Sequence, residues 1–309
     1  SDIIAVHSAH PSAPLSLAAR VVSFGEKDLS RLDQERIALR IPAMRLSVYM
    51  VPKETAHLVL SAVVPPASDS YWQKRYSGEG RAIPAEHYPT WTESILRVAA
   101  TPLTAAEIKQ QLDLPEAIVK AVLNRIAFEG RLLRVGAMSL RSNIIRYVAT
   151  EAWLGSTFAS VAQDQALAWL AGEYLRSFGP ARIKDFQWWT GVTAARAKAA
   201  IATLDTVDVG NGLLLPASDL PGFEKQKPPA SDAVDLLPQW DSYTMGYAPD
   251  GRARFVTPDM QHHVYGKLGA TGGNALGVVL VNGLAHGSWT SRFTGSRMNV
   301  TLNMFEKTT

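Results

Sequence analysis

The feature that most constrains the fold of this chain is an apolar pattern that occurs twice at one constant offset in the sequence. In residues 91–135, apolar side chains at helical spacing predict a short helix, a second helix and then a longer third one. The same order returns in residues 164–204. The matched pairs are Pro102 and Pro180, Glu107 and Asp185, Ile108 and Phe186, Leu123 and Ile201, and Ile126 and Leu204. A frame that matches across two whole units indicates a duplicated architecture.

Short-range sequence signals predict where the helices and hairpins of each copy begin and end. Thr104 and Glu107 have the spacing of a capping box, which predicts the start of a helix. Gly130 ends the third helix, and Arg131–Val135 and Asn143–Tyr147 then predict a hairpin with a basic edge. Three helices followed by a basic hairpin are typical of a winged helix. Val207–Leu215 predicts a shorter wing for the second copy.

The rest of the chain is organised around these copies. A looser copy is predicted near the start, with helices at Leu15–Phe24 and Asp28–Leu39 before an extended Met44–Val51. Glu107 is expected to serve as a cap, and Trp189 as a core residue. The predicted fold is mainly α with α+β character, in tandem winged-helix repeats. The predicted domains are residues 1–90 (a degenerate first winged helix and connector), 91–150, 151–216, and 217–309 (a linker and a small β-barrel or sheet).

The C-terminal part predicts short strands between glycine-rich turns. The pair Asn282-Gly283 is a strong hairpin signal, because both residues tolerate the positive φ that the turn needs. A sheet or barrel follows from this spacing. The β-leaning runs are Tyr243–Tyr247, Arg254–Thr257, Gly277–Val281, His286–Phe293 and Asn299–Phe305.

Composition narrows the class of protein. The 309 residues contain no cysteine, which excludes a disulfide framework and thiolate chemistry. No run of 18 apolar residues and no hydrophobic leader is present, so we expect a cytoplasmic, nucleoid-associated protein that does not enter a membrane. His262 and His263 are adjacent and would face opposite sides of a strand, so neither a metal nor another cofactor is expected.

Charge is distributed unevenly along the chain. The net charge is only +3, but residues 204–251 hold eight acids against two lysines. Residues 130–147 hold four arginines and no acid, and residues 252–309 hold six bases against two acids. Such asymmetry is typical of a surface that binds nucleic acid, although solvated faces often have the same composition.

Several stretches resemble a known family, the winged-helix DNA glycosylases of the AlkZ/YcaQ type found in bacteria. They occur in the family's order over nearly the whole chain. The stretches are Ala18-Ala19-Arg20, Arg40-Ile-Pro-Ala-Met-Arg45, Tyr174 to Gly191, Leu236 to Tyr247 and Val281 to Trp289. The resemblance implies three tandem winged helices, a C-terminal β-barrel and hydrolysis of the N-glycosidic bond of alkylated purines, including those in crosslinks.

The resemblance also implies where catalysis would occur. The family's motif, commonly Gln-x-Gln, corresponds by position to His7-Ser8-Ala9. The first polar residue is therefore His7, and the second is replaced by Ala9. His10 would substitute only in a shifted register. The family's Arg-Gly-Thr-Leu-His stretch also differs, since this chain has Arg45-Leu-Ser-Val-Tyr49.

Chemistry gives a role to His7 and a second candidate. An N7-alkylated purine is already cationic and leaves readily, so the reaction needs mainly a positioned water and a stabilised sugar cation. A neutral imidazole can orient or deprotonate that water. Asp241 can place a carboxylate near the sugar cation, but it can equally cap a turn or pair with an arginine.

The predicted partner is double-stranded DNA carrying alkylation damage, bound through its phosphates by a monomer. Such binding would not depend on sequence and would weaken as salt rises. The predicted DNA-binding residues are Arg45, Lys120, Arg125, Arg131, Arg134, Arg141, Arg292 and Arg297. Two alternatives stay open: a non-catalytic lesion sensor or regulator on the same scaffold, favoured by Ala9, and a module whose basic edge binds protein.

Overall fold

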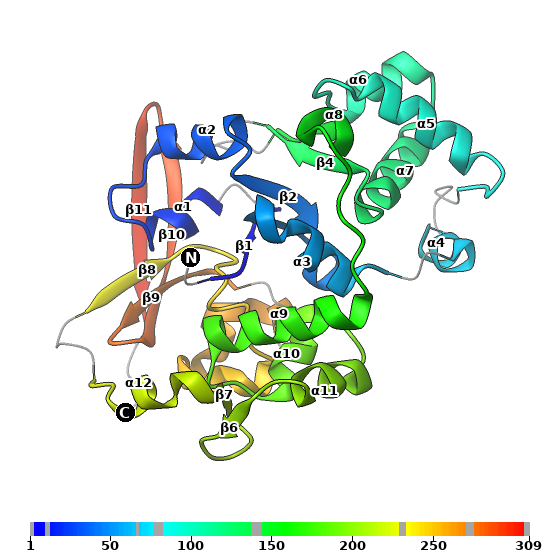
Figure 1. Ribbon diagram of the computed structural model, residues 1–309. Helices are drawn as coiled ribbons and strands as arrows, with labels where there is room; N and C mark the ends of the chain where they lie inside the picture. The colour runs from blue at the N-terminus through cyan, green and yellow to red at the C-terminus, as the bar shows by residue number, and fades with distance from the viewer. Residues whose placement is uncertain are drawn as a thin grey trace. The chain divides into compact units, whose positions relative to one another are not determined.

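The computed structural model describes residues 3–9, 13–65, 68–76, 83–136, 144–228, 233–269 and 275–305. It divides into two compact units (Figure 1). The middle unit contains residues 27–136 and the described residues from 144 to 167. The end unit combines the start of the chain, up to residue 26, with the described residues from 168 onward. Within the described residues, no helix is both long and apolar enough to cross a bilayer.

The middle unit combines an antiparallel sheet with helices. Its strands are ordered β3-β2-β4-β5, and Arg40 of β2 lies opposite Arg134 of β4. The buried core among its helices is mostly aliphatic and includes Ile95, Ile108, Val122 and Ile126. The elements are α2 (Glu26–Gln34), β2 (Ala38–Pro42), β3 (Val48–Pro52), α3 (Ala56–Val63), α4 (Asp69–Tyr76), α5 (Tyr88–Val98), α6 (Ala105–Leu112), α7 (Glu116–Phe128), β4 (Leu132–Val135), β5 (Arg146–Ala149) and α8 (Thr150–Leu154).

The structure contains the same arrangement twice at the spacing seen in the sequence. The helices α5, α6 and α7 and the pair β4–β5 correspond to α9, α10, α11 and the pair β6–β7. The second helix begins at Ala105 in the first copy and at Ile183 in the second copy. The third helix begins at Glu116 and at Ala194, so both starts are displaced by the same offset. The later elements are α9 (Gln163–Phe178), α10 (Ile183–Thr190), α11 (Ala194–Ala202), β6 (Thr206–Asp208) and β7 (Leu214–Pro216).

A backbone bridge repeats along with the helices. Leu103 exchanges two hydrogen bonds with Tyr147 of β5, and Ala181 exchanges two with Leu214 of β7. Leu103 and Ala181 are separated by the same offset as the helix starts. In both copies this bridge ties the chain before the second helix to the last strand of the hairpin. The duplication therefore includes backbone pairing as well as apolar spacing.

Caps at the second helix follow the prediction in the first copy. Thr104 accepts a hydrogen bond from the Glu107 N–H, and Glu107 accepts one from the Thr104 N–H. These bonds lower the pKa of Glu107, because they favour its charged form. In the second copy Asp185 accepts from the backbone of Arg182 in the same way, but it is fully buried. Trp189 lies in the core, as predicted.

The early helices are shorter than predicted. They are α1 (Ala13–Ala18) and α2, which ends at Gln34 instead of continuing to Leu39. Arg36 adopts a φ of +56°, and the Ile37 N–H donates to the Leu32 carbonyl, a bond that closes the helix end. Leu39 then belongs to β2, where it is buried in the sheet.

The C-terminal part forms a four-stranded antiparallel sheet ordered β11-β10-β9-β8. Asn282 and Gly283 join β9 to β10 with φ values of +51° and +82°, as the turn signal predicted. The predicted linker before this sheet also contains a short helix, α12 (Leu220–Glu224). The remaining elements are β8 (Val234–Leu237), α13 (Gln261–Gly269), β9 (Gly277–Val281), β10 (Leu284–Thr294) and β11 (Arg297–Met304).

Two predicted strands in this part are wrong. Residues 243–247 form turns, because the Met245 and Gly246 N–H groups donate to carbonyls three or four residues earlier in the chain. Arg254 ends a 3₁₀ helix, Pro249–Arg254, and does not begin a strand. Aromatic content favoured strands, but local hydrogen bonds at Asp241 and the fixed φ of Pro249 favour turns.

The repeat supplies a stability test at the end of its second helix. Asp113 and Gly191 are equivalent residues with φ of +51° and +80°, a region that glycine enters without a steric cost. We expect Asp113→Gly to raise the free energy of unfolding by about 0.5–1 kcal/mol and Gly191→Asp to lower it by about 1–2 kcal/mol. Urea denaturation measures both. Asp113→Ala removes the same carboxylate but keeps the strain, so a glycine variant no more stable than the alanine variant would contradict the explanation.

A second test concerns acid stability in the end unit. Hydrogen bonds from Arg182, and then from Lys184, lower the pKa of Asp250 to about 2. A carboxyl with a lowered pKa stabilises the folded state above its ordinary pKa of about 3.8, and this contribution disappears as the pH falls toward 2. We expect Asp250→Asn to be less stable than the wild type at pH 5, and the difference to shrink between pH 4 and pH 2. Denaturation at stepped pH measures it, and a constant difference would refute the assignment.

Candidate active site and nucleic-acid surfaces

His7 lies on the short strand β1 (Val6–His7) of the end unit, and its side chain is only 6% exposed. Its imidazole meets the indole of Trp240 at a centroid distance of 5.1 Å and an interplanar angle of 83°. Two residues earlier, the Ala5 carbonyl accepts a hydrogen bond from the Ser242 hydroxyl at 2.9 Å. The segment that carries His7 is thus fixed to residues 240–242 by a ring contact and a buried hydrogen bond.

Asp241 is the charged centre of this region and is completely buried. Arg20 donates to both of its oxygens, at 2.6 and 2.7 Å. The Ser16 hydroxyl donates to Oδ2 at 2.9 Å, and the Tyr243 N–H donates to Oδ1 at 2.9 Å. These are the arginine pair and turn cap that the sequence left open as alternatives to a role at the sugar. The carboxylate therefore accepts hydrogen bonds from groups of its own chain on both oxygens.

Trp240, which precedes Asp241 in the sequence and contacts His7, has an unusual backbone conformation. Trp240 adopts a φ of +60°, in the left-handed region that bulky residues avoid. Its N–H donates to the Ala275 carbonyl at 3.1 Å, while the Asp241 N–H donates to the Pro238 carbonyl at 3.2 Å. The chain is therefore hydrogen-bonded on both sides of the strained residue, and the indole is held against His7.

The other residues that the resemblance aligns with the family's motif carry fewer groups that could take part in catalysis. Ser8 is buried, and Ala9 is exposed and has no side-chain polar atom. His10 lies outside the described residues. Among the described residues, no group of three or more histidine or acidic side chains is placed to hold a metal. His262 and His263 lie on α13 and not on a strand, and their rings are 3.8 Å apart. His7 is thus the titratable group that the motif contributes.

One predicted DNA contact is wrong. Arg125 of α7 is only 6% exposed, and its Nε donates to Glu129 at 3.1 Å. Its guanidinium also lies 3.7 Å from the centre of the Tyr88 ring. The sequence pattern placed Arg125 on a recognition-type helix, but helical geometry turns it inward to an acid one turn later and to an aromatic face. It is therefore not accessible to a phosphate.

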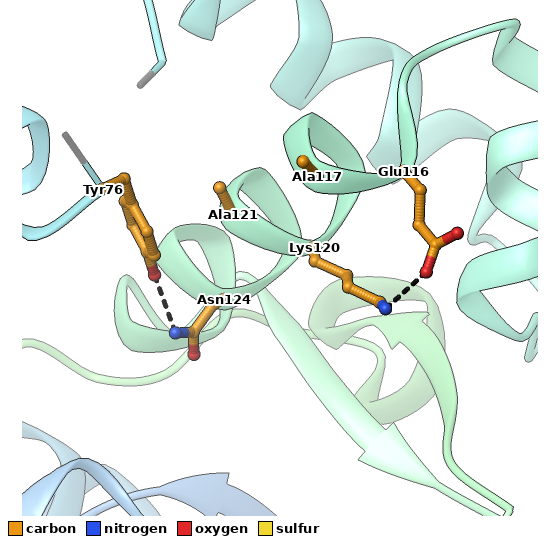
Figure 2. A pocket seen from close by; sticks show the side chains of 6 residues that line it. All are labelled: Tyr76, Glu116, Ala117, Lys120, Ala121 and Asn124. Atoms are coloured by element: carbon orange, nitrogen blue, oxygen red, sulfur yellow. Dashed lines mark hydrogen bonds and ion pairs between the residues drawn. The ribbon is translucent and has the colours of Figure 1, made fainter. Parts of the chain in front are cut away.

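The outer face of α7 is less cationic than its sequence indicates. Lys120 is exposed, but its ammonium is 2.5 Å from Glu116 one turn earlier. The pair lines a groove with a volume of about 460 Å³. Figure 2 shows the pair and, on the same helix, Asn124 hydrogen-bonded to Tyr76 of α4. Lys120 lowers the pKa of Glu116, so the acid is ionised and offsets the lysine charge.

The remaining predicted cations lie on several elements. Arg131 is exposed and pairs with Glu93 at 2.7 Å. Arg134 is half-buried and donates to Asn124 at 3.4 Å. Arg45 is exposed in the turn between β2 and β3, in the middle unit. Arg292 and Arg297 are exposed on β10 and β11, on either side of the last hairpin turn, whereas Arg141 lies outside the described residues.

Sequence reasoning missed three residues of the end-unit site. Arg20 was noted as part of a motif, but nothing in one sequence says that it pairs with the distant Asp241. Ser16 gave no signal. Trp240 was visible as an aromatic residue beside Asp241, but its positive φ was not, because only glycine and asparagine announce that region of backbone space.

Comparison with known proteins identifies the family of this chain. The chain belongs to the AlkZ-like family, whose model, described as DNA glycosylase AlkZ-like, matches residues 2–309. Its fold is similar to that of a solved structure, the Streptomyces sahachiroi DNA glycosylase AlkZ, with a TM-score of 0.76 and 19% identity over 99% of this chain and 83% of that chain. A search of curated proteins found no match. The family resemblance is confirmed, and of the predicted fold class the structure shows the coarser part, helices combined with antiparallel sheets.

The buried ion pair gives a direct stability test. We expect Asp241→Asn to lower the free energy of unfolding by about 2–3 kcal/mol, because the substitution leaves the partly buried Arg20 without its counter-charge and changes the acceptor for Ser16 and the Tyr243 N–H. Chemical denaturation measures the loss. The control is Glu35→Gln, which breaks the exposed pair with Arg31 and should cost under about 1 kcal/mol. Equal effects of the two substitutions would mean that Asp241 does not anchor the end unit.

Proposed function

We propose that the protein is a DNA glycosylase that releases alkylated purines from duplex DNA, with His7 as its catalytic residue. The observation that carries the proposal is the position of His7 within this family's fold. The resemblance aligns His7 with the first place of the family's catalytic motif, and the structure holds it against residues 240–242 with only 6% of its side chain exposed.

The reaction follows from the chemistry of the lesion. The bond between the sugar C1′ and N9 of the cationic purine breaks, and its electron pair stays on N9 and neutralises the departing base. The oxygen of a water forms the new bond to C1′, and the imidazole of His7 accepts the proton that the water loses. The products are a free alkylated base and an abasic site. Asp241 is assigned to positioning, because its oxygens already accept from Arg20, Ser16 and Tyr243.

The scaffold supports a DNA partner. The two copies of three helices and a hairpin have the element order of winged helices, which bind duplex DNA through a helix and a wing. A third, degenerate copy precedes them in this proposal, and the protein acts as a cytoplasmic monomer. Arg45, Arg131, Arg134, Arg141, Arg292 and Arg297 are assigned to phosphates, and Lys120 contributes less because Glu116 offsets it.

A second candidate function has its own support. Ala9 supplies no side-chain hydrogen bond where the family's motif has a second polar residue, and His7 has little exposure. Both features favour a protein that binds alkylated DNA without cleaving it, as a lesion sensor or regulator. The scaffold and its cations would serve that function equally well.

Base release from a defined lesion distinguishes the two functions. We expect the wild type to release N7-methylguanine from a duplex with one lesion, read as strand cleavage after alkaline treatment. His7→Ala should reduce the single-turnover rate about 100-fold or more, because general-base assistance is worth about 10²–10⁴. The control is His57→Ala on α3, which should retain the wild-type rate.

The same samples test binding. Duplex affinity should be unchanged in His7→Ala and should fall steeply with added salt, because phosphate contacts release counterions. Salt-sensitive binding without any base release would support the sensor and refute the glycosylase. Absence of binding at low salt would refute both functions.

A further inference from the structure

The strained conformation of Trp240 is unusual for its residue type. Residues in the left-handed region are usually glycine or asparagine, because a bulky side chain there brings its Cβ too close to the backbone. Of the eight non-glycine residues with positive φ that the described chain contains, Trp240 alone is aromatic. Backbone strain of this kind persists only where the surroundings impose it, and it concentrates at functional sites.

The surroundings of Trp240 do impose it. The next residue, Asp241, is fixed by Arg20, Ser16 and the Tyr243 N–H, and the Thr244 hydroxyl donates to the Asp241 carbonyl at 3.0 Å. On Trp240 itself, the N–H donates to the Ala275 carbonyl. The backbone before and after the indole is therefore held, and the direction of the Cα–Cβ bond that carries the indole is fixed.

That direction leads to His7. The two rings meet nearly perpendicular at 5.1 Å, a geometry that aromatic pairs favour. An imidazole on a strand can still rotate about its side-chain bonds, and a perpendicular ring against it restricts the plane that the imidazole adopts. Ser242 holds the backbone two residues before His7, so backbone and ring are fixed by neighbouring residues of one loop.

We infer that Trp240 is a positioning residue, which uses its strained backbone to hold the His7 imidazole in the orientation required to direct a water at the sugar. The inference rests on the proposed function for its catalytic consequence. Its structural part, that Trp240 orients the His7 ring, holds whether or not the protein is a glycosylase. Asp241 supplies the anchor, Trp240 supplies the contact, and His7 performs the proton transfer.

Two substitutions separate the ring from the backbone. Trp240→Gly removes the indole, and glycine adopts the positive φ of this position without strain, so the loop keeps its conformation. Trp240→Phe keeps an aromatic ring on the same backbone. The matched control is Trp153→Leu, a change to a half-buried tryptophan of the middle unit that stacks with Arg36.

The first readout is independent of activity. In NMR spectra of protein with isotope-labelled histidine, the ring current of the adjacent indole should shift the resonances of the His7 ring protons. The His7→Ala variant assigns these resonances. We expect Trp240→Gly to move these resonances toward their random-coil positions, Trp240→Phe to move them only partly, and Trp153→Leu to leave them in place. Unchanged His7 resonances in Trp240→Gly would overturn the inference.

The second readout is the single-turnover rate of base release set beside duplex affinity. We expect Trp240→Gly to lower the rate about 10- to 100-fold with the dissociation constant unchanged, because misplacement of a catalytic group acts on the chemical step. Trp240→Phe should recover part of the rate. If Trp240 were purely structural, its substitution would lower thermal stability and leave the rate of the folded fraction intact. That result would refute a positioning role.

A failure of the proposed function is recognised separately. If the wild type releases no base, the glycosylase is refuted, and the resonance shifts alone decide whether Trp240 orients His7. If the wild type is active and Trp240→Gly is equally active with shifted resonances, the contact exists but is not needed for catalysis, and the inference is overturned.

Discussion

The structure of the end unit depends on one buried ion pair, between Arg20 and Asp241. Both carboxylate oxygens accept from Arg20, and the Ser16 hydroxyl and the Tyr243 N–H each donate one further hydrogen bond. A buried carboxylate is tolerated only when such donors offset its desolvation, so the start of the chain must lie against residues 240–242. The position of His7, the strain at Trp240 and the bond from Ser242 to Ala5 all follow from that requirement.

Much of the fold could be predicted because local rules and the repeat agreed. The capping residues at Thr104 and the turn at Asn282-Gly283 are short-range signals, and the structure confirms both. Helix α2 was predicted too long, because nothing in residues 34–39 announces the left-handed Arg36 that ends it. The strand predicted at Tyr243–Tyr247 failed because a tertiary anchor, Asp241, decides that segment and its aromatic content does not.

The candidate site was also predictable only in part, because tertiary contacts determine it. His7 and Asp241 could be selected by residue type and family position, but the groups that hold them come from distant parts of the sequence. Arg125 shows the opposite error, since its charge suggested a surface and Glu129 and Tyr88 hold it inside. Charge and periodicity indicate which residues have chemistry, and packing determines which of them can use it.

The separation of Arg20 from Asp241 also has a consequence for biosynthesis. The middle unit is complete once residue 167 has left the ribosome, whereas the ion pair must wait for residue 241. At typical rates of translation the chain from one partner to the other takes roughly 10–40 s to make. Throughout that interval Arg20 lacks the carboxylate that it binds in the folded end unit. The segment that carries His7 is thus synthesised well before the residues that hold it in place.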